Sequence, residues 1–343
     1  MKRSKAILTL LIVGVLCFIF LLGFKYEDFY LTKIYWLNAK KVKVTDFGAT
    51  PDDKFFDDEA FFEAIQAVKK HGKGIIYLPK GVYLLSKPLF LPSNCYLIGE
   101  DVDKTVIARA EDFNEYLVIN DNIDVPGFNG NKNIIVENLT LDDRREIVRH
   151  WGGGVGFAHA ENVAVRNCRI LNPYWHGIEF NAVNNGLIQG CEIFNAKNAA
   201  IQIDASTAEY EGLQGYAFHG LLDEKTPSKN IKIVGNSIKG CLYSGINFAH
   251  REVKEPYSNI IIEKNYIEGN SAYAAIHNEA SVKNTVITGN TVISNVGIII
   301  GKTIEDIEIT KNQIYTRKGA GLIFKNPVKG LYFKDNIIVE PET

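Results

Sequence analysis

The residues of this chain best suited to catalysis form two groups in its central part. The first group is Glu179, Asp204 and His176, and the second is His277, Glu279, His250 and Arg251. Two carboxyl groups held at a suitable distance can act as the acid and the base of a hydrolysis. An imidazole can instead abstract a proton beside a carboxylate that an arginine neutralises. Both uses require elements that bring residues distant in sequence side by side.

Those elements are the coils of a repeat, which begins at residue 133 and restarts at intervals of 22 to 45 residues. Its starting residues are Asn133, Asn162, Asn185, Asn230, Asn259, Asn284, Asp306 and Gly330. The third residue after each start is large and apolar, and the eighth is leucine, isoleucine or valine. Apolar residues that alternate without helical spacing predict short strands, with one coil in each repeat.

Stacking of the coils would bury a continuous apolar column that no single coil can bury. The sixth residue after the start is asparagine in five successive repeats: Asn236, Asn265, Asn290, Asn312 and Asn336. Parallel strands in register would stack these amides about 4.8 Å apart, so that each satisfies polar groups at a corner of the coil. Earlier repeats carry Leu139, Cys168 and Cys191 there, and we predict that the cysteines are small apolar fillers. The columns describe an all-β fold, a right-handed parallel β-helix.

Residues 42–343 are predicted to form this β-helix domain, with a cap and first coils over 42–130 and regular coils over 131–343. Val42–Ala49 has the pattern of a strand and a turn. Asp57 or Asp58 can cap the start of a helix that runs to about Lys70, and His71–Gly74 would end it. A capping helix is expected because an end coil exposes its strand edges and its core.

Residues 1–25 are predicted to be a cytoplasmic tip and a transmembrane helix, and 26–41 a linker. Lys2, Arg3 and Lys5 precede an apolar run over residues 6–24, which is long enough to span a bilayer. No small-x-small cleavage site follows, which predicts an uncleaved anchor. Lys and Arg remain on the cytoplasmic side, so the rest of the chain is expected at the cell surface, or secreted if the segment is cleaved.

Composition argues against nucleic acid as a partner. The 38 basic and 40 acidic residues give a net charge of −2, without the excess of Lys and Arg that non-specific binding to a phosphate backbone requires. The five cysteines are too few and too irregularly spaced for a disulfide framework or a zinc site.

The N-terminal segment resembles that of a known family. Its motifs are Val44–Ala49 (VTDFGA), Gly74–Tyr83 (GIIYLPKGVY) and Leu97–Glu100 (LIGE). They resemble the pectate-lyase-like superfamily of right-handed parallel β-helix proteins, and with the coils the resemblance covers nearly everything after residue 41. It implies action on a polysaccharide, as in pectate lyases, polygalacturonases, alginate epimerases and phage tailspikes. Trp175–Gly177 only partly matches the Gly-His-Gly of polygalacturonases, and the Asp-Pro-His-Glu signature of alginate epimerases is absent, so the resemblance does not choose among these chemistries.

A second strand in each coil carries the catalytic candidates. Its outward positions form one column of Gly156, Glu179, Gln202, Asn247 and His277, and a second of Ala158, Asn181, Asp204, Ala249 and Glu279. We call Glu179, Asn181, Gln202, Asp204, Asn247, His277 and Glu279 the polar stripe. In the next two coils the first column becomes Ile299 and Ile323, so the stripe is bounded, as a site is. Inserted loops over 142–153, 206–227 and 250–257 flank it, and long loops on one face of a repeat fold mark a binding face.

Three functions are compatible with these residues. The leading hypothesis is β-elimination or C5 epimerisation of a uronate-containing polysaccharide by His277, His250, Arg251 and His176, with Tyr243 or Tyr273 returning a proton. The alternative is an inverting glycoside hydrolase that uses Glu179 and Asp204, expected about 7–8 Å apart. A third is a non-catalytic glycan-binding surface protein. The residues predicted to bind the sugar are Trp151, Trp175, Asn181, Gln202, Tyr243, Asn247 and Tyr273. The sequence requires no cofactor, although Glu179, Asp204 and Asn181 could hold Ca²⁺.

Overall fold

The computed structural model describes residues 26–147, 151–206, 224–248, 253–269 and 272–341. The chain divides into two compact units after Asn38. In the first unit, η1 (Tyr26–Leu31) is a short 3₁₀ helix, and the buried Trp36 donates its indole N–H to the Tyr30 carbonyl at 2.7 Å. The transmembrane helix predicted over residues 6–24 lies outside the described residues. Within the described ranges, no helix has both the length and the apolar character needed to cross a membrane.

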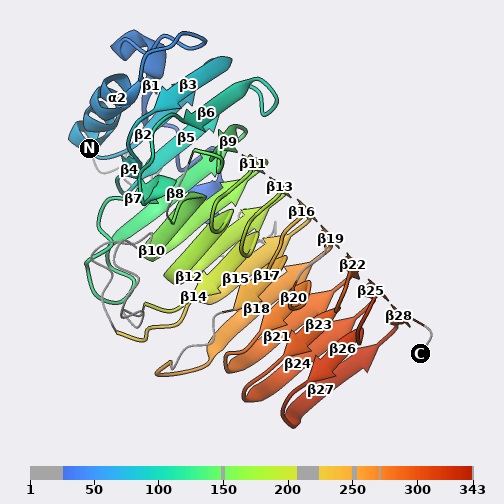
Figure 1. The fold of residues 1–343 in the computed structure, drawn as a ribbon. Coiled ribbons are helices and arrows are strands. Elements are labelled where there is room, and N and C mark those ends of the chain that lie inside the picture. The colour runs from blue at the N-terminus through green and yellow to red at the C-terminus, as the bar shows by residue number, and fades with distance from the viewer. Residues whose placement is uncertain (1–25, 148–150, 207–223, 249–252, 270–271, 342–343) are drawn as a thin grey trace, which may run out of the picture. The chain divides into compact units, whose positions relative to one another are not determined.

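The second unit is a parallel β-solenoid, and its first strand begins at Lys40, slightly before the boundary predicted at residue 42. Each coil contributes a strand to each of three ribbons, and every paired strand is parallel to its neighbour in the next coil (Figure 1). The ribbon that carries the polar stripe contains β4 (Leu89–Leu91), β7 (Tyr116–Asn120), β14 (Ile201–Asp204), β17 (Ile246–Phe248), β20 (Ile276–Asn278), β23 (Ile298–Ile300) and β26 (Leu322–Phe324). We call it the site ribbon.

The other two ribbons complete the coils. The second contains β1 (Lys40–Lys43), β2 (Gly74–Leu78), β5 (Cys95–Gly99), β8 (Asn131–Glu137), β15 (Lys229–Val234), β18 (Tyr257–Glu263), β21 (Val282–Thr288), β24 (Ile304–Thr310) and β27 (Val328–Lys334). The third contains β3 (Gly81–Leu85), β6 (Thr105–Arg109), β9 (Thr140–Asp142), β11 (Arg169–Leu171), β13 (Glu192–Phe194), β16 (Ser237–Lys239), β19 (Tyr266–Glu268), β22 (Thr291–Ser294), β25 (Gln313–Thr316) and β28 (Ile337–Val339). Two longer strands, β10 (Gly153–Arg166) and β12 (Ile178–Gln189), run from the site ribbon into the second.

The stacked columns predicted from the repeat are present. Ile178, Ile201, Ile246 and Ile276 are register partners along the site ribbon, and all are buried. The starting asparagines adopt left-handed backbone conformations, as Asn162 does with a φ of 56°. The sixth-position asparagines form a buried ladder in which each side-chain amide donates to the next, for example from Asn265 Nδ2 to Asn290 Oδ1 at 3.0 Å.

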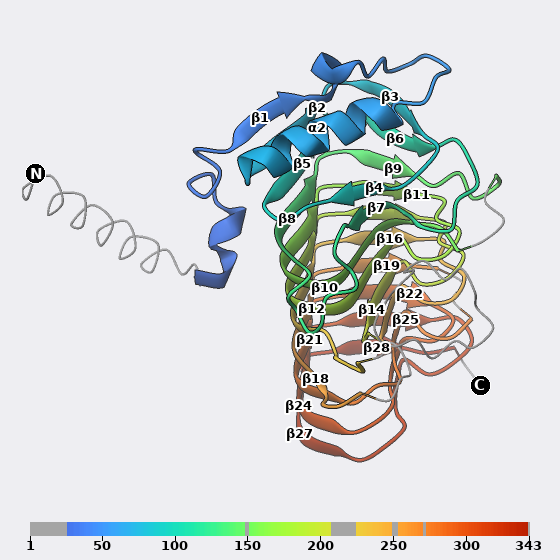
Figure 2. The ribbon, with the colours of Figure 1, turned by 90° about the vertical axis from the view of Figure 1, so that its left-hand side faces the viewer.

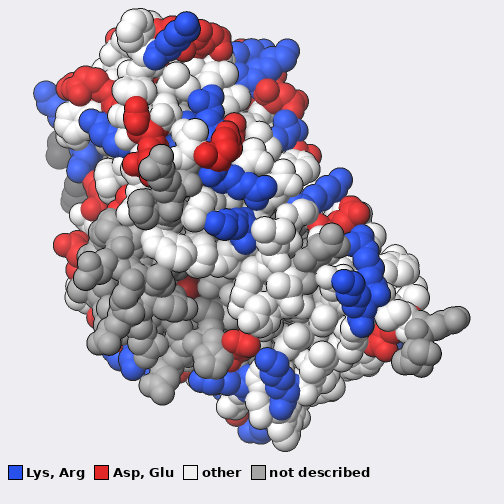
Figure 3. Space-filling view, in the orientation of Figure 1, with Lys and Arg blue, Asp and Glu red and all other residues white. Residues whose placement is uncertain are grey.

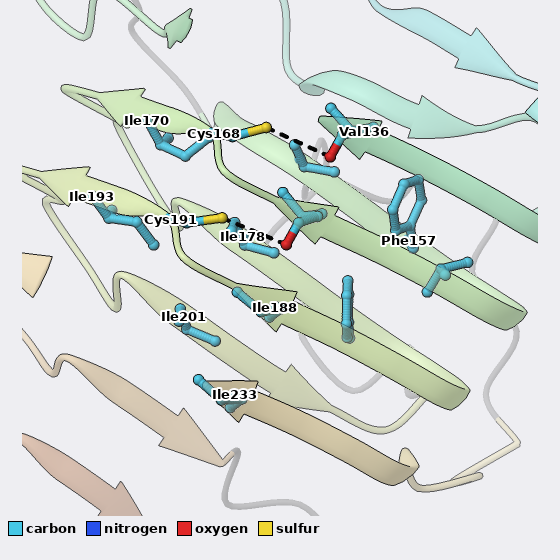
Figure 4. Close-up of a cluster of buried hydrophobic side chains, with 14 of the residues drawn as sticks. Val136, Phe157, Cys168, Ile170, Ile178, Ile188, Cys191, Ile193, Ile201 and Ile233 are labelled. Carbon is cyan, nitrogen blue, oxygen red and sulfur yellow. Dashed lines mark hydrogen bonds between the residues drawn. The ribbon is translucent and has the colours of Figure 1, made fainter. Parts of the chain in front are cut away.

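The two cysteines are apolar fillers, as predicted. Cys168 and Cys191 lie one above the other in the core, and each Sγ is 3.5 Å from a carbonyl of the preceding coil (Figure 4). Burial raises the pKa of the Cys191 thiol to about 12, which keeps it protonated and unreactive.

A helix closes the N-terminal end of the solenoid, as predicted. α2 (Asp58–His71) lies across the first coils and ends at Gly72, whose φ is 82° (Figure 2). Asp57 occupies the N-cap position, but its carboxylate accepts the backbone N–H groups of Thr50 and Leu84 rather than one of the helix. The strand and turn predicted over residues 42–49 are present: β1 ends at Lys43, and the chain then turns through the 3₁₀ helix η2 (Val44–Phe47) to Gly48.

Candidate functional site

The polar stripe lies on the site ribbon with the register expected from the sequence. Glu179 pairs with Gln202, Gln202 with Asn247 and Asn247 with His277, and Asn181 pairs with Asp204. The same column is apolar on both sides, with Ile119 before Gly156 and with Ile299 and Ile323 after His277. In this column polar side chains are therefore confined to the middle of the ribbon, and all seven residues of the polar stripe except Glu279 are buried.

Glu179 is the centre of one end of the stripe. Its Oε1 accepts a hydrogen bond from Asn181 Nδ2 at 2.5 Å, and its Oε2 lies 3.8 Å from His176 Nε2 and accepts the hydroxyl of Tyr116. Tyr116 belongs to β7, and its register partner is Gly153. A Cβ atom on Gly153 would clash with the Tyr116 ring. The absence of a side chain at Gly153 therefore leaves room for the Tyr116 hydroxyl to reach Glu179.

The middle of the stripe is a line of hydrogen bonds between side chains. Gln202 Nε2 donates to Asp204 Oδ2 at 3.3 Å, and Asn247 Nδ2 donates to Gln202 Oε1 at 2.8 Å. The Oδ1 atom of Asn247 lies 2.9 Å from His277 Nδ1. Buried polar groups are costly unless they are hydrogen-bonded, and this line satisfies side chains from three coils.

The other end of the stripe is a charged group around His277. Its Nε2 atom lies 3.3 Å from Glu279 Oε1, and the same carboxylate oxygen is 3.2 Å from Lys325 Nζ. Lys325 follows β26, two coils beyond Glu279, and Gly301 lies in the coil between them. At this end too, a glycine lies in the coil between the two residues of a long-range contact, here Glu279 and Lys325.

Aromatic side chains stand beside both ends. Trp151 packs edge-on against Trp175 with ring centroids 4.3 Å apart, and Trp175 lies next to His176. Tyr243 and Tyr273 are also 4.3 Å apart, and the Tyr273 ring is 5.1 Å from that of His277. The stripe therefore combines polar groups with apolar ring surfaces, and Tyr273 is exposed.

A buried ion pair holds the loop that leads to Trp175 and His176. Asp143 accepts Arg109 Nε at 2.7 Å and the backbone N–H of Tyr174 at 2.7 Å, and both charged side chains are fully buried. Burial raises the pKa of Asp143 to about 6, although the Arg109 guanidinium acts in the opposite direction. The aromatic end of the stripe is therefore anchored to the core rather than left to the loop.

Not every candidate residue can be placed, and two neighbours were missed. His250 and Arg251 lie outside the described residues, as does Ala249 of the second column. Sequence analysis overlooked Tyr116 and Lys325. Tyr116 had a signal, because it opens an apolar strand and is aligned with a glycine in the next coil; Lys325 had none beyond its place in the second outward column.

On the face that Figure 3 shows, acidic and basic residues are interspersed over the described surface. In the ranges that the structure describes, no cluster of three or more His, Cys, Asp and Glu side chains could hold a metal ion.

Comparison with known proteins identifies two matching families. Residues 41–177 match a family model described as "Rhamnogalacturonase A/epimerase, pectate lyase-like", and residues 220–342 match one described as "Periplasmic copper-binding protein (NosD)".

The chain is 29% identical over 165 residues to a pre-neck appendage protein of Bacillus phage B103, covering 45% of this chain and 18% of that protein. It is 38% identical over 81 residues to alginate lyase 7 of Azotobacter vinelandii, covering 22% and 10%. The chain thus spans less than a fifth of the length of these two relatives.

Among solved structures, a surface adhesin of Streptococcus pneumoniae has a similar fold. The TM-score is 0.67 and the identity 18%, over 88% of this chain and 80% of the adhesin. At that identity the likeness concerns the fold alone.

Proposed function

Because the chain belongs to the pectate-lyase-like superfamily of right-handed parallel β-helix proteins, we propose that it modifies a polysaccharide containing uronic acids, outside the cytoplasm. The observation that carries the proposal is the setting of His277. Its Nδ1 atom faces an amide oxygen, its Nε2 atom faces a carboxylate, and an exposed tyrosine ring lies beside it. An imidazole held in this way is suited to general base catalysis.

The proposed reaction begins with proton abstraction. Nε2 of His277 takes the proton from C5 of a uronic residue, and Glu279, 3.3 Å away, stabilises the imidazolium that forms. The electron pair left on C5 is delocalised into the uronate carboxylate, which Arg251 is proposed to neutralise. The bond between C4 and its glycosidic oxygen then breaks, a C4–C5 double bond forms, and Tyr273 or Tyr243 is proposed to donate a proton to the departing oxygen, which completes a β-elimination. Return of a proton to the opposite face of C5, from Tyr273 or Tyr243, would instead complete an epimerisation.

The comparisons support this substrate class. The 81 residues shared with a protein named alginate lyase, and a matched family described as including an epimerase, fit uronate chemistry. The relatives that are named appendage protein and adhesin fit the third hypothesis, that the stripe binds a glycan without changing it.

The test is an assay of the whole chain on alginate, polygalacturonate and a neutral glucan. Ultraviolet absorbance reports elimination, exchange of the C5 hydrogen with deuterated water reports epimerisation, and new reducing ends without absorbance report hydrolysis. His277→Ala should lower elimination or exchange at least about 100-fold, the usual size of general base catalysis. The matched control is His71→Ala, which removes an exposed histidine of α2. Full activity in the His277 variant would overturn the proposal.

Hydrolysis is the second candidate, and the register favours it. Glu179 pairs with Gln202, so Asp204 lies diagonally across one strand spacing, where about 7–8 Å is expected. That separation suits an inverting mechanism. Both carboxylates are fully buried and hydrogen-bonded to the stripe, which favours a supporting role for them. Reducing ends that vanish in Glu179→Gln would decide for hydrolysis.

A metal is the remaining question. The described residues between 220 and 342 do not fit a copper site, because Cys241 is buried in the core away from His277 and no cluster of ligands forms there. Ca²⁺ at Glu179, Asp204 and Asn181 stays a proposal, and activity measured with and without a chelator tests it.

A further inference from the structure

We propose that Asp204 sets the tautomer of His277 through the side-chain amides of Gln202 and Asn247. These four side chains come from β14, β17 and β20, and all are buried. We call them the amide relay. Hydrogen bonds link neighbouring members of the relay, and in each of them the donor lies on the His277 side and the acceptor on the Asp204 side.

The direction of these hydrogen bonds is set by the Asp204 carboxylate. Asp204 Oδ1 accepts the backbone N–H of Ala205 at 2.9 Å and Oδ2 accepts Gln202 Nε2 at 3.3 Å, so both oxygens act as acceptors, as in an ionised carboxylate. Gln202 must therefore turn its NH₂ group toward Asp204 and its Oε1 toward Asn247. The latter oxygen accepts Asn247 Nδ2 at 2.8 Å, which leaves Asn247 Oδ1 facing the histidine.

The tautomer follows from that last oxygen. Asn247 Oδ1 can only accept, so His277 must carry its proton on Nδ1, 2.9 Å away. A neutral imidazole has one N–H group, and Nε2 is therefore left with its lone pair. The groups that face the ring among the described residues are Glu279, Tyr243 and Tyr273, with Lys325 behind Glu279.

The consequence for catalysis rests on the proposed function. Only the tautomer with a lone pair on Nε2 can accept a proton from the substrate on that side. The reverse tautomer would direct an N–H group at Glu279 and would not act as a base there. Asp204, Gln202 and Asn247 are positioning residues in this scheme, because they act through His277.

A single-atom change should reverse the relay. In Asp204→Asn, the Ala205 N–H still needs an acceptor, which holds the new amide oxygen at the Oδ1 position and places NH₂ against Gln202. Gln202 and then Asn247 must turn over, so that an NH₂ group faces Nδ1 and the proton of His277 moves to Nε2. The double variant Asp204→Asn, Asn247→Asp restores an acceptor beside Nδ1 and should return the original tautomer.

The experiment is ¹⁵N NMR of the whole chain labelled in histidine, at about pH 9, well above the usual histidine pKa of about 6.5. Long-range correlations within the ring distinguish the two tautomers, and the His277→Gln variant identifies the signal. We expect Nδ1–H in the unchanged protein, Nε2–H in Asp204→Asn, and Nδ1–H again in the double variant. The matched control is Asp57→Asn, the same change at a buried carboxylate of the cap, which should leave the tautomer unchanged.

Either of two results would overturn the inference: Nε2–H in the unchanged protein, or an unaltered tautomer in Asp204→Asn while circular dichroism shows that the variant is folded. Activity is measured in parallel, and Asp204→Asn should lose about 100-fold in turnover and the double variant should regain it. A switched tautomer with unchanged turnover would leave the relay standing and would refute His277 as the base, so that the two proposals fail separately.

Discussion

His159 shows at the scale of one residue how burial sets the protonation of an imidazole near the site. It is fully buried in a left-handed conformation with a φ of 50°, and its Nδ1 atom lies 2.7 Å from the Gly127 carbonyl. Burial lowers the pKa of His159, although the Gly127 carbonyl and the charge of Glu224 act in the opposite direction. The folded protein therefore holds this side chain neutral more strongly than the unfolded chain does.

The sign of the pH dependence follows from that shift. A folded-state pKa below the unfolded value means that the stabilisation is present above about pH 6.5 and is lost as the pH falls through the folded value. His159→Asn should remove this dependence, because asparagine tolerates the left-handed conformation and its NH₂ group can still donate to Gly127. Urea unfolding between about pH 4 and 8 measures it, and an equally steep acid decline in the variant would contradict the assignment.

At the scale of the element, the site depends on glycines at two positions along the site ribbon, where an added Cβ atom would crowd a residue that makes a longer contact. Most neighbours on a parallel ribbon touch only across one strand spacing. Tyr116 and Lys325 reach further, and each does so over a coil that carries a glycine, Gly153 or Gly301. These glycines connect each end of the stripe to the coil beyond its immediate neighbour.

Gly153→Ala tests this use of a missing side chain. The added methyl group would clash with the Tyr116 ring and the His176 carbonyl, and overpacking of this kind costs about 1–3 kcal/mol in the free energy of unfolding. The control is Gly235→Asn, where the φ of 65° suits asparagine and an added Cβ has open space around it. Urea unfolding compares the two, and equal stabilities would show that the ribbon accommodates the methyl group.

At the scale of the whole solenoid, the stability of each coil depends on its contacts with the neighbouring coils. Each coil contacts its neighbours, so the molecule behaves as a one-dimensional stack whose ends need covering. α2 covers the first coils through Phe61, which is fully buried and packs edge-on against Tyr83 with ring centroids 5.8 Å apart. The helix thus protects the end nearest the first strands.

Phe61→Ala should therefore destabilise the whole stack by about 3–5 kcal/mol, the usual cost of emptying a phenylalanine site in a core. The neighbouring Phe62 is 48% exposed, and Phe62→Ala should change the unfolding free energy little. Chemical unfolding followed by tryptophan fluorescence and by circular dichroism gives the comparison. An unchanged midpoint in Phe61→Ala would show that the cap does not support the coils.

The repeated columns of this protein can be predicted directly from its amino-acid pattern. Val136 and Val165 are matched in register, as are Cys168 and Cys191 in their column, because side chains of in-register parallel strands repeat with the coil and leave a period that can be read directly. The confinement of polar residues in the first outward column to four successive coils could be read in the same way. The extent of the cap helix followed from local signals, Asp57 before it and Gly72 after it.

The contacts between those side chains, in contrast, depend on how the coils are assembled. The contact of Tyr116 with Glu179 spans two coils. The repeat period of the sequence does not show that the Tyr116 side chain passes over Gly153. The common direction of the amide relay arises from an ionised carboxylate that accepts but cannot donate, and from amides that each do both. The direction of these hydrogen bonds arises only when Asp204, Gln202, Asn247 and His277 are assembled side by side, because an isolated amide can take either orientation.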